Sequence, residues 1–530
     1  MRSMMVGAFW AAAACGALAD RPNFIFILAD DLGYGDVRAC NPAGKIPTPH
    51  MDRLAREGVL FTDAHSGSAV CTPTRYGVVT GRYCWRSRLQ RGVLGGLSPR
   101  LIEPGRITVA SFLKERGYRT ACIGKWHLGM DWVRVEGKGV SELEIEKPDE
   151  VWNVDFAKPV ANGPNSVGFD YYFGISASLD MVPYTFIEND RVKVVPTKDL
   201  DFPMTAGVDG KRTRKGPAAE GFDASDVLPT LRERAVGFID AAAKGFKDGQ
   251  PFFLYLPLAS PHTPIVPSKG WLGRSGLSAY ADFVMETDAA VGAVLDALDR
   301  GGIARDTVVI MTSDNGCSPS ANFEELLAKG HNPSHVFRGH KADIYDGGHR
   351  VPFIVRWPAR GRAAVTSSQL VCLTDFMATC ADILGERLPE GAGEDSFSFL
   401  GAIGVEGKGP VRESVVHHSI NGSFAIREGR WKLELCPGSG GWSAPRPGAD
   451  DTSGMPACQL YDMASDVGER DNAQAEHPEV VSRLTRTLEK IVADGRSTLG
   501  TPQVNSVEVD IWKAGREAHR PPAAKKAKKK

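Results

Sequence analysis

The stretch from Asn23 to Asp31 reads Asn-Phe-Ile-Phe-Ile-Leu-Ala-Asp-Asp, an aromatic and β-branched run that ends in two adjacent carboxylates. Short apolar runs of this kind predict strands that are buried on both faces of a sheet. Three more runs share the design: Tyr118–Ile123, Phe252–Leu258 and Thr307–Ser313. The polar residues that follow them are Gly124-Lys125-Trp126-His127, Ser260-Pro261-His262 and Asp314-Asn315. Because ligands collect beyond the carboxyl ends of parallel strands, we expect these polar residues to share one site.

Helical patterns separate the four runs. Thr48 and Pro49 suit the cap and the first position of a helix that ends at Gly58. Apolar residues also recur at helical spacing over 108–116 and 282–300. Strands that alternate with helices predict an α/β fold, here a large central mixed β-sheet flanked by helices.

The chain divides by composition into four segments. Residues 1–19 combine a charged start, an apolar stretch and a small-residue end, as a secretory signal peptide does. Residues 20–404 form the main, site-bearing domain, in which 136–220 is irregular and predicted to supply surface insertions around the site. Residues 405–512 predict a small sheet-plus-helix domain, with a hairpin over 423–435 and a helix over 477–494. The lysine-rich residues 513–530 predict a basic, disordered tail.

Bulk properties narrow the class of protein. The 530 residues carry a formal net charge of −1, so nothing global points to nucleic acid or to an acidic membrane. The N-terminal apolar stretch is too short for a membrane span, and we expect an exported, periplasmic or secreted protein without a transmembrane segment. Lipoprotein anchoring at Cys15 is not expected, because no leucine lies three positions before it. Of the ten cysteines, Cys436 and Cys458 flank a Gly/Pro/Ser-rich loop and are the disulfide pair we expect.

The two acidic strand ends are the first candidate functional group. Asp30, Asp31, Asp314 and Asn315 offer three carboxylates and an amide oxygen, without histidine or cysteine. Adjacent acids repel each other, which favours a cation nearby. An all-oxygen set suits a hard cation, calcium before magnesium, and suits zinc poorly. The ordinary alternative for either pair alone is a helix cap or a turn.

The segment Cys71-Thr72-Pro73-Thr74-Arg75 is the second candidate group. Thr72 and Pro73 make a good helix start, which places residue 71 at a helix N-terminus, where backbone N–H groups favour an anion. Arg75 lies one turn further on and can point to the same place. The alternative is a buried structural cysteine beside a surface arginine.

Further basic residues form the third group. Lys125 and His127 flank Trp126 at a strand end, and two prolines hold His262. Lys341 precedes the run from Asp346 to Pro352, which reads Asp-Gly-Gly-His-Arg-Val-Pro. Each of them alone reads as a surface lysine or a hydrogen-bonded histidine. Together with an oxygen-bound cation they would form a positive pocket for an anion.

In their order along the chain these motifs resemble the type I, formylglycine-dependent sulfatases of the alkaline phosphatase superfamily. The family carries Asp-Asp after its first strand, C-x-P-x-R, Gly-Lys-Trp-His, Pro-His, Asp-Asn-Gly and a later lysine before Gly-Gly-x-Arg, and this chain has all of them. The resemblance implies an alkaline phosphatase-like fold and hydrolysis of sulfate esters. It departs at Thr74, Val79 and Asp346, which replace commoner residues without removing a chemical group.

The resemblance also implies roles for single residues. A separate maturation enzyme would oxidise Cys71 to formylglycine. Residue 71 would bind one calcium ion together with Asp30, Asp31, Asp314 and Asn315. The residues that would bind sulfate or move protons are Arg75, Lys125, His127, His262, Lys341 and, near the sulfate, Ser178.

Two other functions stay open from the sequence. One is a phosphatase or phosphodiesterase of the alkaline phosphatase superfamily, although such enzymes typically use Ser or Thr and two metals with His ligands. The other is a non-catalytic glycan-binding protein on the same scaffold, which would be expected to lack a nucleophile or a metal ligand. A sulfated carbohydrate is the expected substrate, because an exported enzyme meets such polymers. Candidate sugar contacts are Trp132, Tyr184, His340, His349 and Trp442.

Overall fold

The computed structural model describes residues 21–407, 412–446 and 448–512. The predicted signal peptide and basic tail therefore lie outside the described residues. Across the described ranges, we find no helix of the length and apolar character that crossing a bilayer requires.

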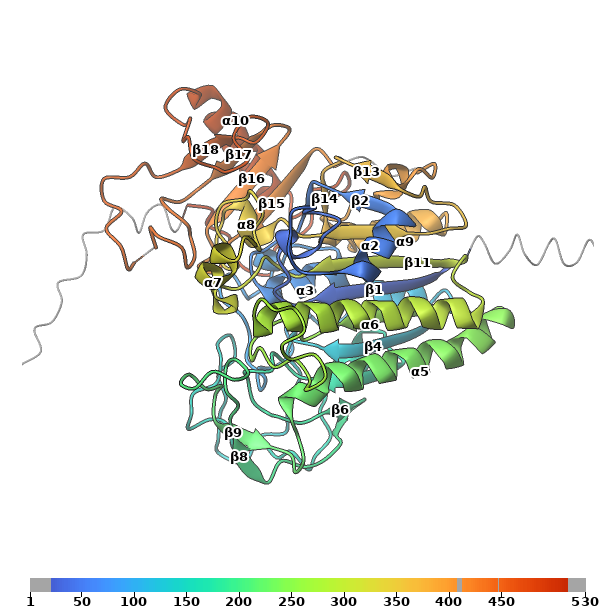
Figure 1. Cartoon of the computed structure of the whole chain (residues 1–530). Helices are drawn as coiled ribbons and strands as arrows, with labels where there is room; N and C mark the ends of the chain where they lie inside the picture. Colours follow the sequence, from blue (N-terminus) through green and yellow to red (C-terminus); the bar gives the residue numbers. More distant parts are fainter. Residues whose placement is uncertain (1–20, 408–411, 447, 513–530) are drawn as a thin grey trace, which may run out of the picture.

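A ten-stranded mixed sheet forms the centre of the molecule (Figure 1). Its strand order is β13-β2-β12-β11-β1-β10-β4-β5-β6-β7. The bounds are β1 Asn23–Ala29, β2 Val59–Phe61, β4 Arg119–Lys125, β5 Tyr171–Ile175, β6 Ile187–Glu188, β7 Arg191–Val192, β10 Phe252–Pro257, β11 Thr307–Ser313, β12 Phe353–Arg356 and β13 Val365–Ser367. The four strands expected from the sequence lie side by side and parallel, in the order β11-β1-β10-β4. The prediction of an α/β fold with a large mixed sheet is confirmed.

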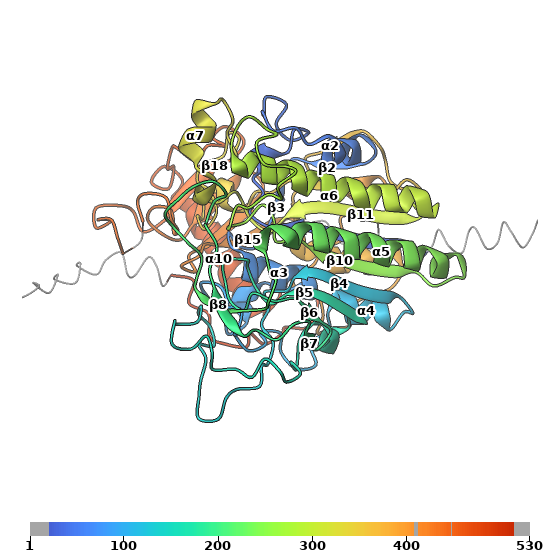
Figure 2. The ribbon, with the colours of Figure 1, turned by 60° about the horizontal axis from the view of Figure 1, so that its bottom comes forward.

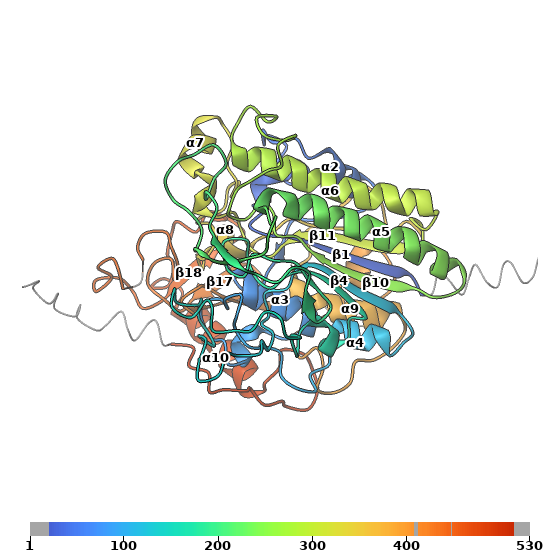
Figure 3. The ribbon, with the colours of Figure 1, turned by 90° about the horizontal axis from the view of Figure 1, so that it is seen from below.

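Helices cover both faces of this sheet. Figures 2 and 3 show α5 and α6 lying across one face. Alternate residues of β1 serve the two cores: Ile25 and Ile27 pack in the cluster that contains α5 and α6, and Phe24 and Phe26 in the opposite one. This alternation follows from the two-residue period of a strand and explains why β1 is apolar along its length. The helices are α2 Pro49–Arg56, α3 Cys71–Thr80, α4 Val109–Lys114, α5 Val227–Lys247, α6 Ala279–Gly301, α7 Phe323–Ala328, α8 Asp346–His349, α9 Phe376–Ile383 and α10 Pro478–Ala493.

A second, four-stranded antiparallel sheet follows in the chain and lies at one end of the molecule (Figure 1). Its strands are β15 Ser414–His418, β16 Phe424–Glu428, β17 Trp431–Glu434 and β18 Gln459–Asp462. Leu484 and Leu488 of α10 pack in one cluster with Ile426 and Leu433 of this sheet. The expected hairpin and C-terminal helix are both present.

The segment 136–220 differs in part from the expectation of irregular insertions. Its strand β5 pairs in parallel with β4 inside the central sheet, and β6 and β7 extend that sheet to its edge. A separate pair, β8 Lys198–Leu200 and β9 Gly216–Ala218, lies beyond them. Because polar residues surround β5, the sequence pattern did not indicate a buried strand there. The pairing of β5 with β4 defines its place in the sheet. Elsewhere in the chain, β3 Ala64–His65 pairs with β14 Val371–Cys372.

The expected Cys436–Cys458 disulfide is wrong. All nine cysteines within the described residues are buried free thiols. Cys436 packs in a small cluster with Tyr345 and Tyr461, whereas Cys458 belongs to the cluster of α10. The two thiols therefore serve different apolar clusters of the small sheet.

Candidate active site

The carboxyl ends of the four parallel strands bring the predicted site residues together. Asp30 and Asp31 follow β1, Lys125 ends β4, His262 follows β10, and Asp314 begins the turn after β11. Strand ends of one parallel set point to the same edge, so local sequence places these groups near one another. Each of these five side chains is at most 6% exposed.

Four oxygen-bearing side chains form the floor of the site. The Asn315 Nδ2 atom donates to Asp31 Oδ1 at 2.7 Å, and the Asp31 backbone N–H donates to Asp314 Oδ1 at 3.2 Å. Two buried oxygens, Asp30 Oδ1 and Asn315 Oδ1, have no hydrogen-bond partner among the described residues. Burial and the nearby Asp30 raise the pKa of Asp314 to about 7. Crowded, dry carboxylates with unpartnered oxygens are what a bound hard cation would relieve.

Cationic side chains reach into the same floor. Lys125 Nζ donates to Asp30 Oδ2 at 2.5 Å, and Lys341 Nζ lies 2.7 Å from Asp31 Oδ1. Arg75 Nη2 donates to Asp314 Oδ2 at 2.8 Å, and its Nη1 donates to the Lys125 carbonyl at 3.0 Å. Although burial opposes ionisation, Lys125, His262 and Arg75 hold the pKa of Asp30 well below its usual range. Three cationic side chains, Arg75, Lys125 and Lys341, therefore surround the acidic floor. We call this arrangement of acids and cations the cup.

Cys71 is the first residue of α3, as the sequence predicts. Val70 is extended and caps the helix, so the chain turns into α3 directly at the thiol. Cys71 is 2% exposed, and burial raises the pKa of its thiol, while Lys125 and Lys341 act in the opposite direction. The charges that act on this thiol belong to the cup, so residue 71 faces both the cations and the acids.

His127 and His262 differ in their hydrogen bonds. His127 has a left-handed backbone (φ 54°), and its Nε2 donates to the Leu94 carbonyl at 2.8 Å. Its Nδ1 has no partner among the described residues. Burial and Lys125 lower the pKa of His127 well below its usual range, which keeps the ring neutral and leaves a lone pair on Nδ1. His262 donates from Nδ1 to the Thr263 carbonyl at 2.6 Å, so its Nε2 faces Asp31 Oδ2 at 3.6 Å.

Ser178 lies in the segment that follows β5, with a buried hydroxyl that lacks a hydrogen-bond partner among the described residues. Asp180, two residues further on, places Oδ1 4.0 Å from His262 Nδ1 and pairs with Arg214 at 2.7 Å. No pattern in the sequence pointed to Asp180, because its segment carries neither strand nor helix periodicity.

The candidate sugar contacts divide by burial. Trp132 donates from Nε1 to the Gly96 carbonyl, Tyr184 hydrogen bonds to Thr213, and His349 is fully buried. These three side chains are at most 6% exposed and pack inside the protein. His340 is partly exposed, and Trp442 is 43% exposed, so both remain available.

Comparison with known proteins identifies the family. The sulfatase family model matches residues 22–386. The chain is 33% identical over 513 residues to N-acetylgalactosamine-6-O-sulfatase of Bacteroides thetaiotaomicron, which covers 90% of this chain and 94% of that protein. It is 31% identical over 516 residues to arylsulfatase A of Homo sapiens, with 93% and 92% covered.

A solved structure gives the same result. It comes from work on the metabolism of multiple glycosaminoglycans by Bacteroides thetaiotaomicron, and it superposes with a TM-score of 0.75 at 32% identity. The match covers 89% of this chain and 99% of that chain. The family match over most of the chain and the identity to named sulfatases show that the chain belongs to the sulfatase family and is a sulfuric ester hydrolase.

Proposed function

We propose that the protein removes sulfate from a sulfated carbohydrate, with a formylglycine made from Cys71 and one calcium ion. The observation that carries this proposal is the position of Cys71 at the start of α3, buried where the charges of Lys125, Lys341, Asp30 and Asp314 all act on it. Among the described cysteines, only Cys71 begins an α-helix.

The floor of the cup fits a calcium ion. Asp30, Asp31, Asp314 and Asn315 supply oxygen ligands, and residue 71 would complete the set. The unpartnered oxygens of Asp30 and Asn315 are the atoms that an ion would engage. When bound, the ion supplies positive charge that draws electron density from the sulfate oxygens.

Residue 71 needs a different chemistry from that of a thiol. Once a maturation enzyme has oxidised it, the hydrated aldehyde supplies one hydroxyl to attack sulfur and a second whose deprotonation allows sulfate to leave. Arg75, Lys125 and Lys341 orient the sulfate and offset its charge. Asp314, which lies in the floor of the cup and accepts a hydrogen bond from Arg75, is placed to take a proton at the start of the reaction.

The two histidines divide the remaining proton transfers. His262 protonates the leaving alcohol from Nε2, since its Nδ1 proton is fixed on the Thr263 carbonyl. His127 accepts a proton at its unpartnered Nδ1, since its Nε2 proton is fixed on the Leu94 carbonyl. Ser178 lies in the segment after the neighbouring strand β5, and we assign it to the rim of the sulfate pocket.

The substrate class rests on the relatives. N-acetylgalactosamine-6-O-sulfatase is named for a sulfated amino sugar, and the related solved structure comes from work on glycosaminoglycans. We therefore propose a sulfated carbohydrate as the substrate and export of the protein by its N-terminal segment. We place the catalytic domain at residues 20–404 and the small domain at 405–512.

The test begins with the state of residue 71. The full chain is produced together with a formylglycine-generating enzyme, and the mass of the peptide that contains residue 71 is measured. Sulfate release is then assayed on N-acetylgalactosamine 6-sulfate, other sulfated sugars and the matching phosphate ester. We expect conversion of Cys71, release of sulfate from a sugar and a large preference over phosphate.

Cys71→Ala should abolish turnover, with a loss of at least about 10³-fold, because the nucleophile is gone. Cys380→Ala, which removes another buried thiol, is the matched control and should retain activity. Sulfate release by the Cys71→Ala variant would contradict the proposal. Preferred release of phosphate would support the phosphatase instead, and sugar binding without turnover by converted protein would support the glycan-binding alternative.

A further inference from the structure

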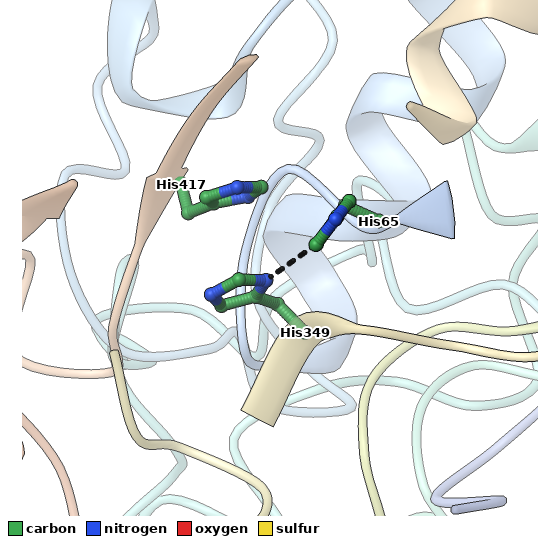
Figure 4. Close-up of side chains that lie close together, drawn as sticks. All are labelled: His65, His349 and His417. Carbon is green, nitrogen blue, oxygen red and sulfur yellow. Dashed lines mark hydrogen bonds between the residues drawn. The ribbon is translucent and has the colours of Figure 1, made fainter. Parts of the chain in front are cut away.

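Three buried histidines meet outside the active site (Figure 4). His65 ends β3, His349 ends α8, and His417 lies in β15 of the small sheet. All three side chains are 0% exposed, and one nitrogen from each lies within 4.8 Å of the others. They come from three distant parts of the chain, and sulfate hydrolysis as proposed above uses none of them.

Each ring has one nitrogen committed to an outer acceptor. His65 Nε2 bonds to Asp63 Oδ1 at 2.8 Å, and His349 Nε2 bonds to the Ile344 carbonyl at 2.9 Å. His417 Nδ1 bonds to the Ser66 carbonyl at 3.1 Å. Carbonyl oxygens accept hydrogen bonds and do not donate, and an ionised carboxylate behaves in the same way, so these ring nitrogens carry the protons.

The other nitrogen of each neutral ring is then a bare lone pair. His65 Nδ1 and His349 Nδ1 lie 3.1 Å apart and face each other. His417 Nε2 is buried without a hydrogen-bond partner in the described part of the chain. Two lone pairs at this distance repel each other unless a proton or a cation lies between them. A proton is disfavoured, because burial lowers the pKa of His65 and, with Lys432, holds that of His349 well below its usual range.

We propose that His65, His349 and His417 bind one divalent transition-metal ion, zinc in the first place, at the junction of the central and small sheets. Neutral imidazole suits zinc, copper and nickel, whereas the all-oxygen floor of the active site suits calcium. The outer hydrogen bonds match those that orient metal-binding histidines in proteins. Three protein ligands leave the fourth tetrahedral position for water.

One adjustment accompanies binding. The rings of His349 and His417 lie nearly parallel, at 12° with centroids 3.8 Å apart, so a single ion cannot lie in both planes. The ion is held first between the two Nδ1 atoms, and the His417 ring tilts about its soft Cβ–Cγ torsion to bring Nε2 toward it. Asp63 and Asp346 stand behind the rings as balancing charges, at 2.8 Å and 3.8 Å from His65 and His349.

The site would join parts of the fold that are separate in the chain. β3 pairs with β14 beside the central sheet, whereas β15 is the first strand of the small sheet. Because a site built from three elements exists only in the folded state, binding free energy would add to folding free energy. We therefore assign the ion a structural role, and its loss should lower the melting temperature before it lowers turnover.

The experiment uses the full chain without a polyhistidine tag. The protein is stripped with a chelator, returned to excess calcium, given zinc chloride and passed through a desalting column. We expect one zinc per chain by mass spectrometry of the metals, and a higher melting temperature than in calcium alone.

The variants separate ligation from packing. His65→Gln and His349→Gln keep a donor near Nε2 for the outer hydrogen bond and lose the Nδ1 lone pair. His417→Asn keeps a donor near Nδ1 and loses Nε2. Each should retain calcium-dependent turnover and lower zinc occupancy at least ten-fold, whereas His477→Gln, a more exposed histidine of the small domain, should bind zinc like the parent.

Anomalous scattering at the zinc edge locates the ion in the parent protein, so this test does not depend on whether a variant folds. Crystals of the parent protein grown with zinc should show a peak between His65 Nδ1 and His349 Nδ1. No peak there, a peak only beside Asp31 and His262, or equal zinc content in the parent and His349→Gln would overturn the proposal.

Discussion

The hydrogen bonds of His262 determine which of its two ring nitrogens is free to exchange a proton. His262 holds one ring proton on the Thr263 carbonyl at 2.6 Å and presents Nε2 toward Asp31, at 3.6 Å. A ring fixed in this way has a single nitrogen for exchange with substrate. Because Arg75, Lys125 and Lys341 are all paired with acids, we propose that His262 supplies the proton to the leaving alkoxide.

His262→Ala should therefore act according to the leaving group. A sugar alkoxide needs a proton to leave, so kcat on a sulfated sugar should fall about 10²- to 10⁴-fold. On 4-nitrophenyl sulfate, whose phenolate leaves unaided, the loss should be within about ten-fold. The measurement is kcat and KM for both substrates, and an equal loss on both would remove the assignment of His262 as the general acid.

At the scale of elements, one close contact and one unusual backbone conformation hold the strand ends that carry the site. β5 packs so tightly on β4 that a Cβ added at Gly174 would lie 1.7 Å from the Gly124 carbonyl oxygen. Gly124 itself has φ 141°, a conformation that side chains rarely adopt, one residue before Lys125. The end of β4 can therefore hold Lys125 in place only because both positions lack a side chain.

Gly174→Ala should force β5 away from β4 and cost about 3 kcal/mol or more, since backbone cannot give way as a side chain can. The melting temperature and turnover should fall together. Gly237→Ala, at an exposed position of α5 where an added Cβ meets nothing within 4 Å, is the control. It should be neutral or stabilise by about 0.5–1 kcal/mol.

The insertion that contains Glu146 braces the loop beside His127. The Leu97 N–H bonds to Glu146 Oε1, and burial raises the pKa of this carboxyl to about 7 from 4.5. Because the pKa of Glu146 is raised in the folded state, its protonated carboxyl contributes fully to the free energy of unfolding below about pH 4.5. This contribution is lost as pH rises through about 7, because the folded protein binds more protons than the unfolded chain.

Glu146→Gln should accordingly flatten the fall of melting temperature between pH 5 and pH 8, and leave a protein more stable at pH 8 than the parent. Glu144→Gln, an exposed neighbour, should follow the parent curve. Thermal scans across this range decide the matter. If the melting temperatures of the parent and Glu146→Gln changed with pH in parallel, the pKa of Glu146 would not be raised by folding.

At the scale of the whole molecule, the small sheet packs against the segment that follows α3 through a shared apolar cluster. Trp85, which lies just beyond α3, stacks on Tyr83 and packs edge-on to Phe424 of β16 at 5.3 Å between ring centroids. Tyr83, Trp85 and Phe424 belong to the cluster that also holds α10. The two sheets should therefore unfold together.

Trp85→Ala should cost about 3–5 kcal/mol, the range for removing a buried aromatic ring, and should lower a single melting transition. Trp442→Ala removes a ring that is 43% exposed and should change stability by less than about 0.5 kcal/mol. Calorimetry with both variants is the measurement. Separate melting of two units in the parent would contradict the single packed assembly.

The sequence by itself determined the four parallel strands, the helix that begins at Cys71 and the acids and bases at the strand ends. These follow from local periodicity and from residue types at the ends of elements, which neighbours along the chain are enough to specify. The sequence also identified the family, because the motifs occur along the chain in the order that is typical of the family.

Only the tertiary structure decided the rest. The place of β5, the approach of Asp180 to His262, the separation of Cys436 from Cys458 and the meeting of His65 with His349 and His417 all join residues that no short-range pattern relates. Such contacts arise when apolar faces of distant segments are buried together, and burial then fixes which polar groups are left facing one another. The tertiary structure also places Trp132, Tyr184 and His349, which the sequence offered as candidate sugar contacts, in the packed interior.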